Sequence, residues 1–116
     1  MADCEKQSIL KTIRGMMGPD EDYEYFDAQL IIHINAAFSR LCQIGVGPER
    51  PFKITGVEEC WTDFLPDGYQ EEVKQYIFLS VKNIFDPPAS ASVMNAYKEQ
   101  IDKLEWLLEE TARFGY

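Results

Sequence analysis

The side chains most suited to catalysis are His33 and Cys42, which could act as a base and a nucleophile. His33 is the single histidine of the 116 residues. Both residues fall in a stretch expected to form one helix, on which nine positions span about 13 Å, so the two side chains cannot meet. We interpret His33 as a structural residue at the edge of a helix face. We expect no catalytic residues and no enzymatic activity.

An acidic run at residues 20–24 is the only pattern that resembles a metal site, because it is similar to the start of a calcium-binding loop. That loop needs glycine at its sixth position and glutamate at its twelfth, where this chain has Tyr25 and Ile31. The stretch of residues 45–48 is too short for a phosphate-binding loop, since it is not G-x-G-x-x-G and no Lys-Ser/Thr pair follows it. The sequence therefore predicts no metal and no cofactor.

Composition and charge narrow the classes of function that remain possible. The chain has 20 acidic and 11 basic residues, which gives a net charge of −9, and 46% of its residues are hydrophobic. Such an acidic protein is repelled by nucleic-acid phosphates and by anionic membranes. The longest apolar runs have four residues, as at 76–79, against the roughly 20 needed to span a bilayer. We expect one domain over residues 1–116, with no membrane association.

The cysteines and the start of the chain indicate the cellular compartment. Cys4, Cys42 and Cys60 are widely spaced and form no C-x-x-C pair. An odd and sparse set of cysteines is typical of reduced thiols in a cytosolic setting. The first residues contain no long apolar run, so no signal peptide is expected.

Four helices are predicted from apolar side chains at helical spacing. Their expected bounds are 5–17, 27–44, 70–85 and a last helix from Ser90 or Ser92 to about Arg113. Asp27 is expected to cap the second helix, and Gly45 to end it. The last helix carries a heptad-like seam at Met94, Tyr97, Ile101, Leu104 and Leu108.

Residues 45–69 interrupt this helical pattern. They are expected to form an irregular loop or a short β-hairpin, with a short strand at 52–54 and one helical turn at 61–65. The aromatic side chains Phe52, Trp61 and Phe64 indicate a loop folded onto the core rather than a linker. The expected fold is all-α, with about four helices and this insertion between the second and third.

The chain has more apolar side chains than one small core can bury. Trp106 lies opposite the seam of the last helix, beside Glu99 and Arg113, and Ile32 points away from the apolar stripe of its own helix. The helix over 70–85 is apolar on nearly every side, which indicates burial by neighbours that could include other subunits. Trp106 either contacts a partner or packs under the loop, and the sequence leaves both open.

In their order and spacing, several segments resemble the tailed-phage head-to-tail connector family, also described as head completion or portal adaptor proteins. These segments are 22–27, 31–35, 45–48, 61–65, 85–88 and 104–106, and the resemblance spans about residues 8–108. It implies a small helical structural protein of the virion, encoded by a phage or prophage. It also implies a homo-oligomeric ring beneath the portal protein that extends the DNA channel and offers a platform for stopper or tail-completion proteins.

The same resemblance implies how the surfaces are used. DNA would pass through the ring only as cargo, and the protein would assemble in the bacterial cytoplasm before residing at the head–tail interface of the virion. It also places Trp106 at the portal and the loop of residues 45–69 at a subunit boundary or the lumen. The candidate interface residues are Trp106, Ile32, Phe78, Leu79 and Trp61.

Two other classes of protein remain open. One is a small helical adaptor or regulatory protein that binds a partner one-to-one, as when a helix or peptide docks in a groove. The other is a small enzyme that depends on His33, which the absence of a nucleophile–base spacing disfavours.

Overall fold

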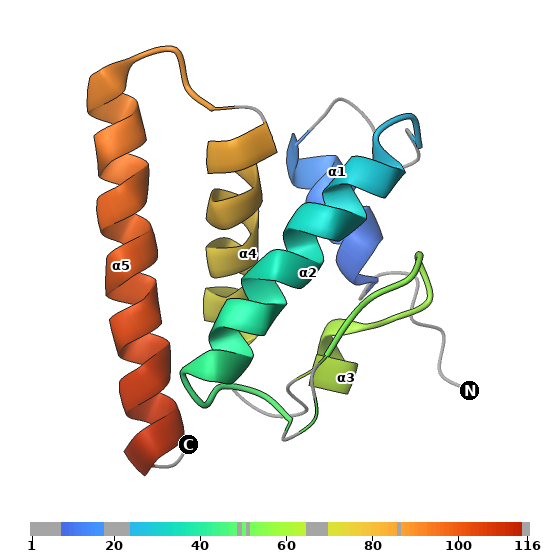
Figure 1. The fold of residues 1–116 in the computed structure, drawn as a ribbon, viewed down its shortest axis with the longest axis vertical. Helices are drawn as coiled ribbons and strands as arrows, with labels where there is room; N and C mark the ends of the chain where they lie inside the picture. The colour runs from blue at the N-terminus through green and yellow to red at the C-terminus, as the bar shows by residue number, and fades with distance from the viewer. Residues whose placement is uncertain are drawn as a thin grey trace.

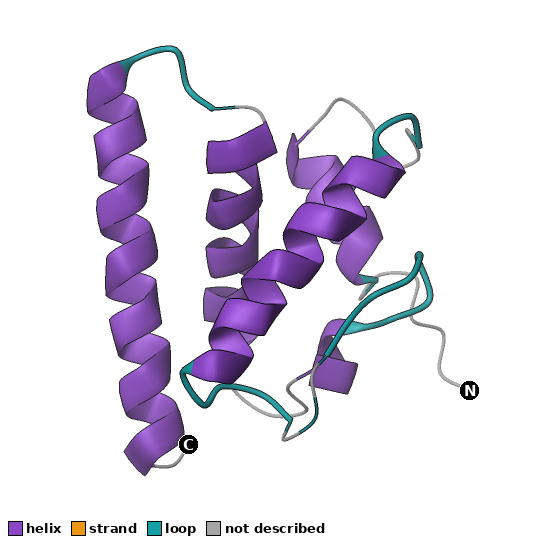
Figure 2. Cartoon of the chain, viewed as in Figure 1, coloured by secondary structure: helices purple, strands orange, loops and turns teal. Residues whose placement is uncertain are grey.

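Five helices make up most of the chain in the computed structural model, which describes residues 8–17, 24–48, 50, 52–64, 70–85 and 87–114. They are α1 (Ile9–Met17), α2 (Asp27–Gln43), α3 (Trp61–Phe64), α4 (Gln70–Phe85) and α5 (Ala91–Phe114), as Figures 1 and 2 show. The all-α prediction is confirmed, with the single turn of α3 as a fifth helix. The described residues contain no strand, so the predicted strand at 52–54 is not formed. Ser8 and Cys60 make an isolated antiparallel bridge instead.

Helix α4 is the central element of a flat molecule that measures 39 × 37 × 19 Å. It packs against α1, α2 and α5 (Figure 1). Because three helices surround it, α4 can be apolar on most of its sides without any contact from another subunit. The side chains that it buries are Val73, Tyr76, Ile77, Leu79 and Val81. Ile84 is an exception that remains exposed.

The C-terminus of α2 ends in a glycine-dependent turn, as predicted. Gly45 has a φ of 91°. Its N–H donates to the carbonyl of Cys42, and the N–H of Val46 donates to that of Leu41 at 2.9 Å. This pair of bonds is a Schellman motif, and the buried Val46 supplies its apolar contact. The chain therefore leaves α2 in a defined direction toward the 45–64 segment.

The N-terminus of α2 differs from the prediction. Phe26 occupies the N-cap position and makes no side-chain cap, whereas Asp27 is the first residue of the helix. The carboxylate of Asp27 instead accepts hydrogen bonds from Nε and Nη2 of Arg14, with 2.8 Å for the Nε bond. Arg14 is only 5% exposed. The predicted cap is wrong because a buried guanidinium from α1 takes the carboxylate that would have capped the helix.

Two polar clamps organise the segment between α2 and α3. The Asn35 side chain pairs with both backbone groups of Ile54, accepting its N–H at 2.7 Å and donating to its carbonyl at 3.0 Å. Glu59 accepts from Thr55 N–H and hydroxyl and from Gly56 N–H. These bonds satisfy backbone groups of residues 54–56 without a sheet, so this part of the segment is held in place although it is irregular.

The single turn of α3 places two aromatic rings in the core, as predicted. Trp61 and Phe64 are each 1% exposed, and the ring centre of Phe64 lies 4.6 Å from that of Phe38. The indole Nε1–H of Trp61 donates to the hydroxyl of Thr12 on α1 at 3.1 Å. This short helix therefore closes the core from the side opposite to α5.

Helix α5 attaches along the predicted seam. Leu104 and Leu108 are buried, and Tyr97 and Ile101 pack against the core while staying partly exposed. The attachment is concentrated in the second half of the helix, which lies beside the first half of α4. The α5 helix is otherwise the most solvent-exposed of the long elements.

The thiols only partly match the prediction of reduced cysteines. Cys42 is free, and Cys4 lies outside the described residues. Cys60, however, is disulfide-bonded, which corrects the expectation for this residue. None of the described helices is both long enough and apolar enough to cross a membrane.

Candidate interaction surfaces

The two residues considered for catalysis do not form a site. His33 and Cys42 lie on the continuous helix α2, so about 13 Å of helix axis separates them. The His33 ring is partly buried beside Phe85, with ring centres 6.2 Å apart. The Cys42 thiol is therefore out of hydrogen-bond reach of this imidazole.

Most of the acidic run that resembled a calcium loop, residues 20–23 of 20–24, lies outside the described residues. Elsewhere, in the described ranges, no group of three or more His, Cys, Asp or Glu side chains is arranged to hold a metal ion.

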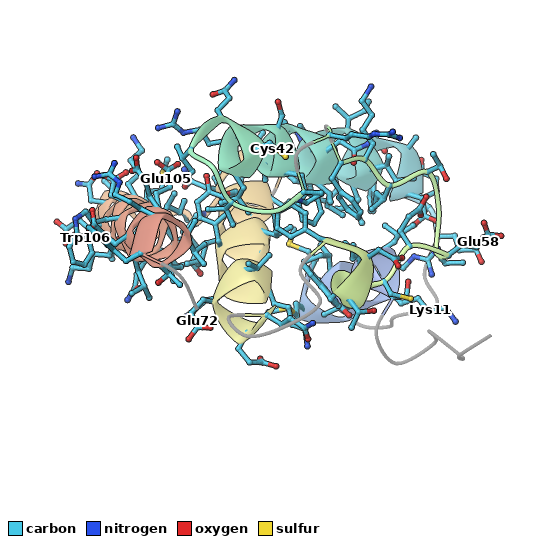
Figure 3. All side chains as sticks on the ribbon, turned by 90° about the horizontal axis from the view of Figure 1, so that it is seen from below. Lys11, Cys42, Glu58, Glu72, Glu105 and Trp106 are labelled. Atoms are coloured by element: carbon cyan, nitrogen blue, oxygen red, sulfur yellow. The ribbon has the colours of Figure 1, made fainter. Side chains whose placement is uncertain are left out.

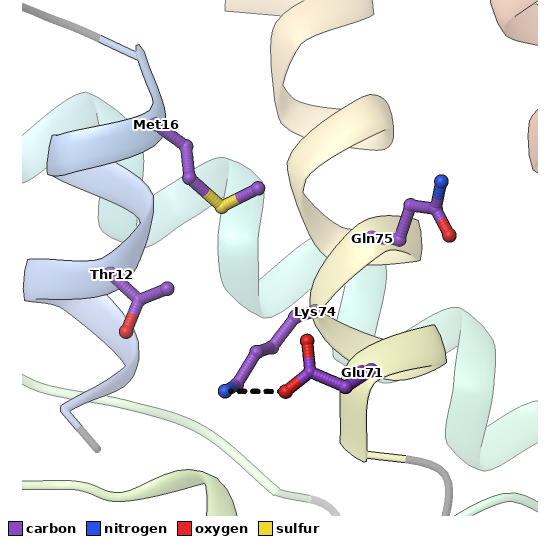
Figure 4. Close-up of a pocket in the computed structure, with 5 residues that line it drawn as sticks. All are labelled: Thr12, Met16, Glu71, Lys74 and Gln75. Carbon is purple, nitrogen blue, oxygen red and sulfur yellow. Dashed lines mark hydrogen bonds and ion pairs between the residues drawn. The ribbon is translucent and has the colours of Figure 1, made fainter. Parts of the chain in front are cut away.

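A shallow pocket lies between α1 and α4 and is lined by Thr12, Met16, Glu71, Lys74 and Gln75 (Figure 4). Its charged groups already have partners in the chain. Lys74 pairs with Glu71 at 3.3 Å and lies 6.0 Å from the centre of the Trp61 ring. The Thr12 hydroxyl donates to the carbonyl of Ser8 and accepts from Trp61. These contacts are structural, and they leave little polar chemistry for a ligand.

A polar cluster joins three helices where α5 meets the body of the molecule. The carboxylate of Glu105 on α5 accepts a hydrogen bond from the Tyr76 hydroxyl of α4 at 2.7 Å. It also accepts from Nε and Nη2 of Arg40 on α2, at 3.3 and 3.2 Å. A single carboxylate thus connects α5 to both α2 and α4, directly beside the buried Leu104.

This cluster favours the ionised form of Glu105. Partial burial opposes ionisation, but the hydrogen bonds from Arg40 and Tyr76 outweigh it and lower the pKa of the Glu105 carboxyl. Burial and the bond to the carboxylate raise the pKa of Tyr76, which therefore stays protonated and remains a donor. The attachment of α5 is consequently strongest when Glu105 is charged.

We expect this attachment to weaken in acid. Because the pKa of Glu105 is lowered in the folded state, its contribution is present above the unfolded-state pKa and is lost as the pH falls through the folded one. The change Tyr76→Phe should lower the free energy of unfolding by about 1.5 kcal/mol at pH 7. The loss should shrink as the pH falls through the lowered pKa of Glu105, because the Tyr76 hydroxyl then faces a neutral carboxyl. Urea denaturation over a series of acidic pH values measures this trend, and a loss that stays constant throughout would contradict this role for Glu105.

The most exposed large side chains of α5 lie on the face that points away from the body. Trp106 is 64% exposed and extends outward from the molecule, away from α2 and α4 (Figure 3). Packing under the loop, one of the two interpretations left open, is therefore excluded. Leu107 and Phe114 are also exposed beside it on the same helix. Neither residue is among the interface residues predicted from the sequence, although their offsets of one and eight positions from Trp106 place them on a shared face.

The other candidate interface residues divide into exposed and buried. Ile32 is 65% exposed on the outer face of α2. Phe78 is partly buried against the core. Leu79 and Trp61 are buried inside the folded chain, so neither offers a surface to a partner. Their burial has a physical cause, because α4 lies between three helices and α3 turns its indole inward.

These features define a small, flat helical protein whose last helix is bound to the body on one face and presents an exposed tryptophan on the other. The chain belongs to the family of phage connector proteins, because the model of that family matches residues 9–113. No curated protein and no solved structure matches the chain. Membership assigns a structural role in the connection between phage head and tail, and it makes the protein a component of the virion.

Proposed function

We propose that the protein forms a homo-oligomeric ring beneath the portal, where it extends the DNA channel and provides the platform on which stopper or tail-completion proteins dock. Family membership supports the head–tail location. The observation that carries the interaction role is Trp106, a large aromatic side chain left 64% exposed on a charged helix. Exposed tryptophans are enriched among the residues that dominate binding energies at protein interfaces.

Ring formation requires two different contact surfaces on each subunit, because rings close through head-to-tail contacts. The chain offers apolar side chains on separate elements, with Trp106 on α5 and Ile32 on α2. In this proposal Trp106 meets the portal protein, and the segment of residues 45–69 lies at a subunit boundary or the lumen. Assembly takes place in the host cytoplasm, and the role involves no catalysis.

The net charge of −9 fits a channel through which DNA passes as cargo. Carboxylates repel the phosphate backbone, so they let DNA slide rather than hold it. This part of the proposal requires that carboxylates face the lumen.

Native mass spectrometry of the protein mixed with the portal protein from the same genome tests the proposal. We expect a mass increase of one 13.4 kDa chain for each portal subunit. One copy bound per portal assembly would instead favour a one-to-one adaptor. No binding to an intact portal ring would overturn the proposed ring.

A second prediction concerns Trp106 directly. The change Trp106→Ala should leave the melting temperature of the isolated chain nearly unchanged, because the side chain is exposed. It should weaken binding to the portal by at least about tenfold, since interface tryptophans commonly contribute more than about 1.4 kcal/mol. Ile84→Ala is the matched control, because it removes a similarly exposed apolar side chain from another helix, one that the proposal assigns to no contact. A large loss of thermal stability in Trp106→Ala would show that this residue stabilises the fold.

A further inference from the structure

The outer face of α5 carries an ordered series of charges around two apolar side chains. At about 100° per residue, six side chains fall within an arc of about 120°. They are Glu99, Lys103, Trp106, Leu107, Glu110 and Arg113. Five of the six are exposed, and Glu110 is partly exposed. None of them belongs to the seam that attaches α5 to the body, so this outer face is available to a partner.

The charges on this face form a self-complementary pattern. From the N-terminus the series runs negative, positive, apolar, negative, positive. In the opposite direction the signs are reversed. A second α5 helix lying antiparallel would therefore place Lys103 opposite Glu110 and Glu99 opposite Arg113. A contact between Trp106 and Leu107 would lie between these two pairings. All three contacts have their midpoint at nearly the same place along the helix, so one two-fold axis can relate the two helices in all of them.

We propose that the outer face of α5 binds a second copy of this chain as an antiparallel, two-fold symmetric pair of helices. Each charge pairing then occurs twice, as in every isologous interface. A parallel pair would place Lys103 against Lys103 and Glu110 against Glu110, which is repulsive. The charge order therefore selects both the partner and its direction.

The charges of this face have few competing partners among the residues that the structure describes. Lys103 and Glu110 make no ion pair among the described residues. Arg113 pairs with Glu109 on its own helix at 3.6 Å, where Arg113 is 60% exposed, so this contact is weak and easily exchanged.

The contact is small, so the dimer should be weak. From Glu99 to Arg113 the face is about 21 Å long, which is roughly four turns of helix. An interface of this size is below the usual range for stable complexes, and we expect a dissociation constant on the order of 10⁻⁴ M. The proposal concerns the free chain and does not depend on the proposed ring. Because the dimer covers Trp106, it has to dissociate before that side chain can meet the portal.

Sedimentation equilibrium tests the proposal with the full chain in low salt. Between about 10 µM and about 1 mM, the average mass should rise from 13.4 kDa toward twice that value. Lys103→Glu alone, or Glu110→Lys alone, should raise the dissociation constant by at least about tenfold, because each places two like-charge contacts in the interface. The double variant Lys103→Glu with Glu110→Lys should restore dimerisation, since it exchanges the two charges.

Lys98→Glu is the matched control, because it makes the same charge change on α5 outside the arc and should dimerise like the wild type. Circular dichroism establishes that each variant keeps its helices. A wild-type chain that stays monomeric up to about 1 mM would overturn the proposal. So would a double variant that remains as monomeric as the single ones, or an average mass that exceeds that of a dimer.

Discussion

Replacing Gly47 by alanine is expected to lower the free energy of unfolding by about 2–5 kcal/mol, from backbone strain and overpacking together. Gly47 has a φ of 99°, which side-chain-bearing residues rarely adopt. A Cβ atom at this position would lie 2.4 Å from Cε1 and 2.5 Å from Cζ of Phe64. Because Phe64 is enclosed by the core and 1% exposed, its ring cannot move aside without disturbing other aromatic side chains.

Gly45→Ala separates the two causes of this loss. Gly45 has a similar φ of 91°, but a Cβ atom added there would meet no other atom within 4 Å. Its substitution should therefore show the backbone strain alone, about 1–2 kcal/mol. Urea denaturation followed by circular dichroism gives both values. If the two variants lose the same stability, the contact with Phe64 does not constrain this turn.

The helices could be predicted from the sequence because their apolar spacing is regular. The helix over 70–85 was predicted with the bounds that it has, and Gly45 ends α2 as expected. Local chemistry alone determines such features. The cap expected at Asp27 failed because the same carboxylate can serve a helix end or an ion pair. The choice depends on where Arg14 lies in three dimensions.

The candidate surfaces also divide into features that the local sequence determines and features that depend on contacts in three dimensions. Helical geometry alone predicted that Trp106 would lie opposite the seam, and it is exposed there. The contact between Tyr76 and Glu105 could not be predicted, since it depends on the register of α5 against α4. Trp61 and Leu79 were proposed as interface residues because a surplus of apolar side chains can be buried by a partner or by the chain itself. Only the packing of α4 and α3 shows that the chain itself buries these two side chains.

The two faces of α5 perform separate tasks within a short stretch of sequence. Leu104, Glu105 and Leu108 hold the helix on the body, whereas Trp106 and Leu107 point outward. A rigid attachment fixes the position of the outer face, which reduces the ordering that binding would otherwise require. Changes at Tyr76 or Glu105 should therefore affect partner binding through the placement of α5, even though neither residue would touch the partner.

The buried ion pair between α1 and α2 should have the other large effect on stability. Arg14→Met is expected to lower the free energy of unfolding by about 3–5 kcal/mol, because it leaves the partly buried carboxylate of Asp27 without its guanidinium. The side chain of Arg14 is 4% exposed and that of Asp27 is 24% exposed, so water cannot fully replace the lost bonds. Methionine keeps most of the aliphatic volume, which limits the loss from packing.

The double variant Arg14→Met with Asp27→Leu identifies the origin of this loss. Replacing a buried ion pair by apolar side chains of similar volume is often nearly neutral, whereas removing one partner is costly. The double variant should therefore be more stable than Arg14→Met alone. Thermal and urea denaturation of the three proteins measure the difference. An additive loss in the double variant would mean that Arg14 stabilises the junction of α1 and α2 mainly by filling space and not through its charge.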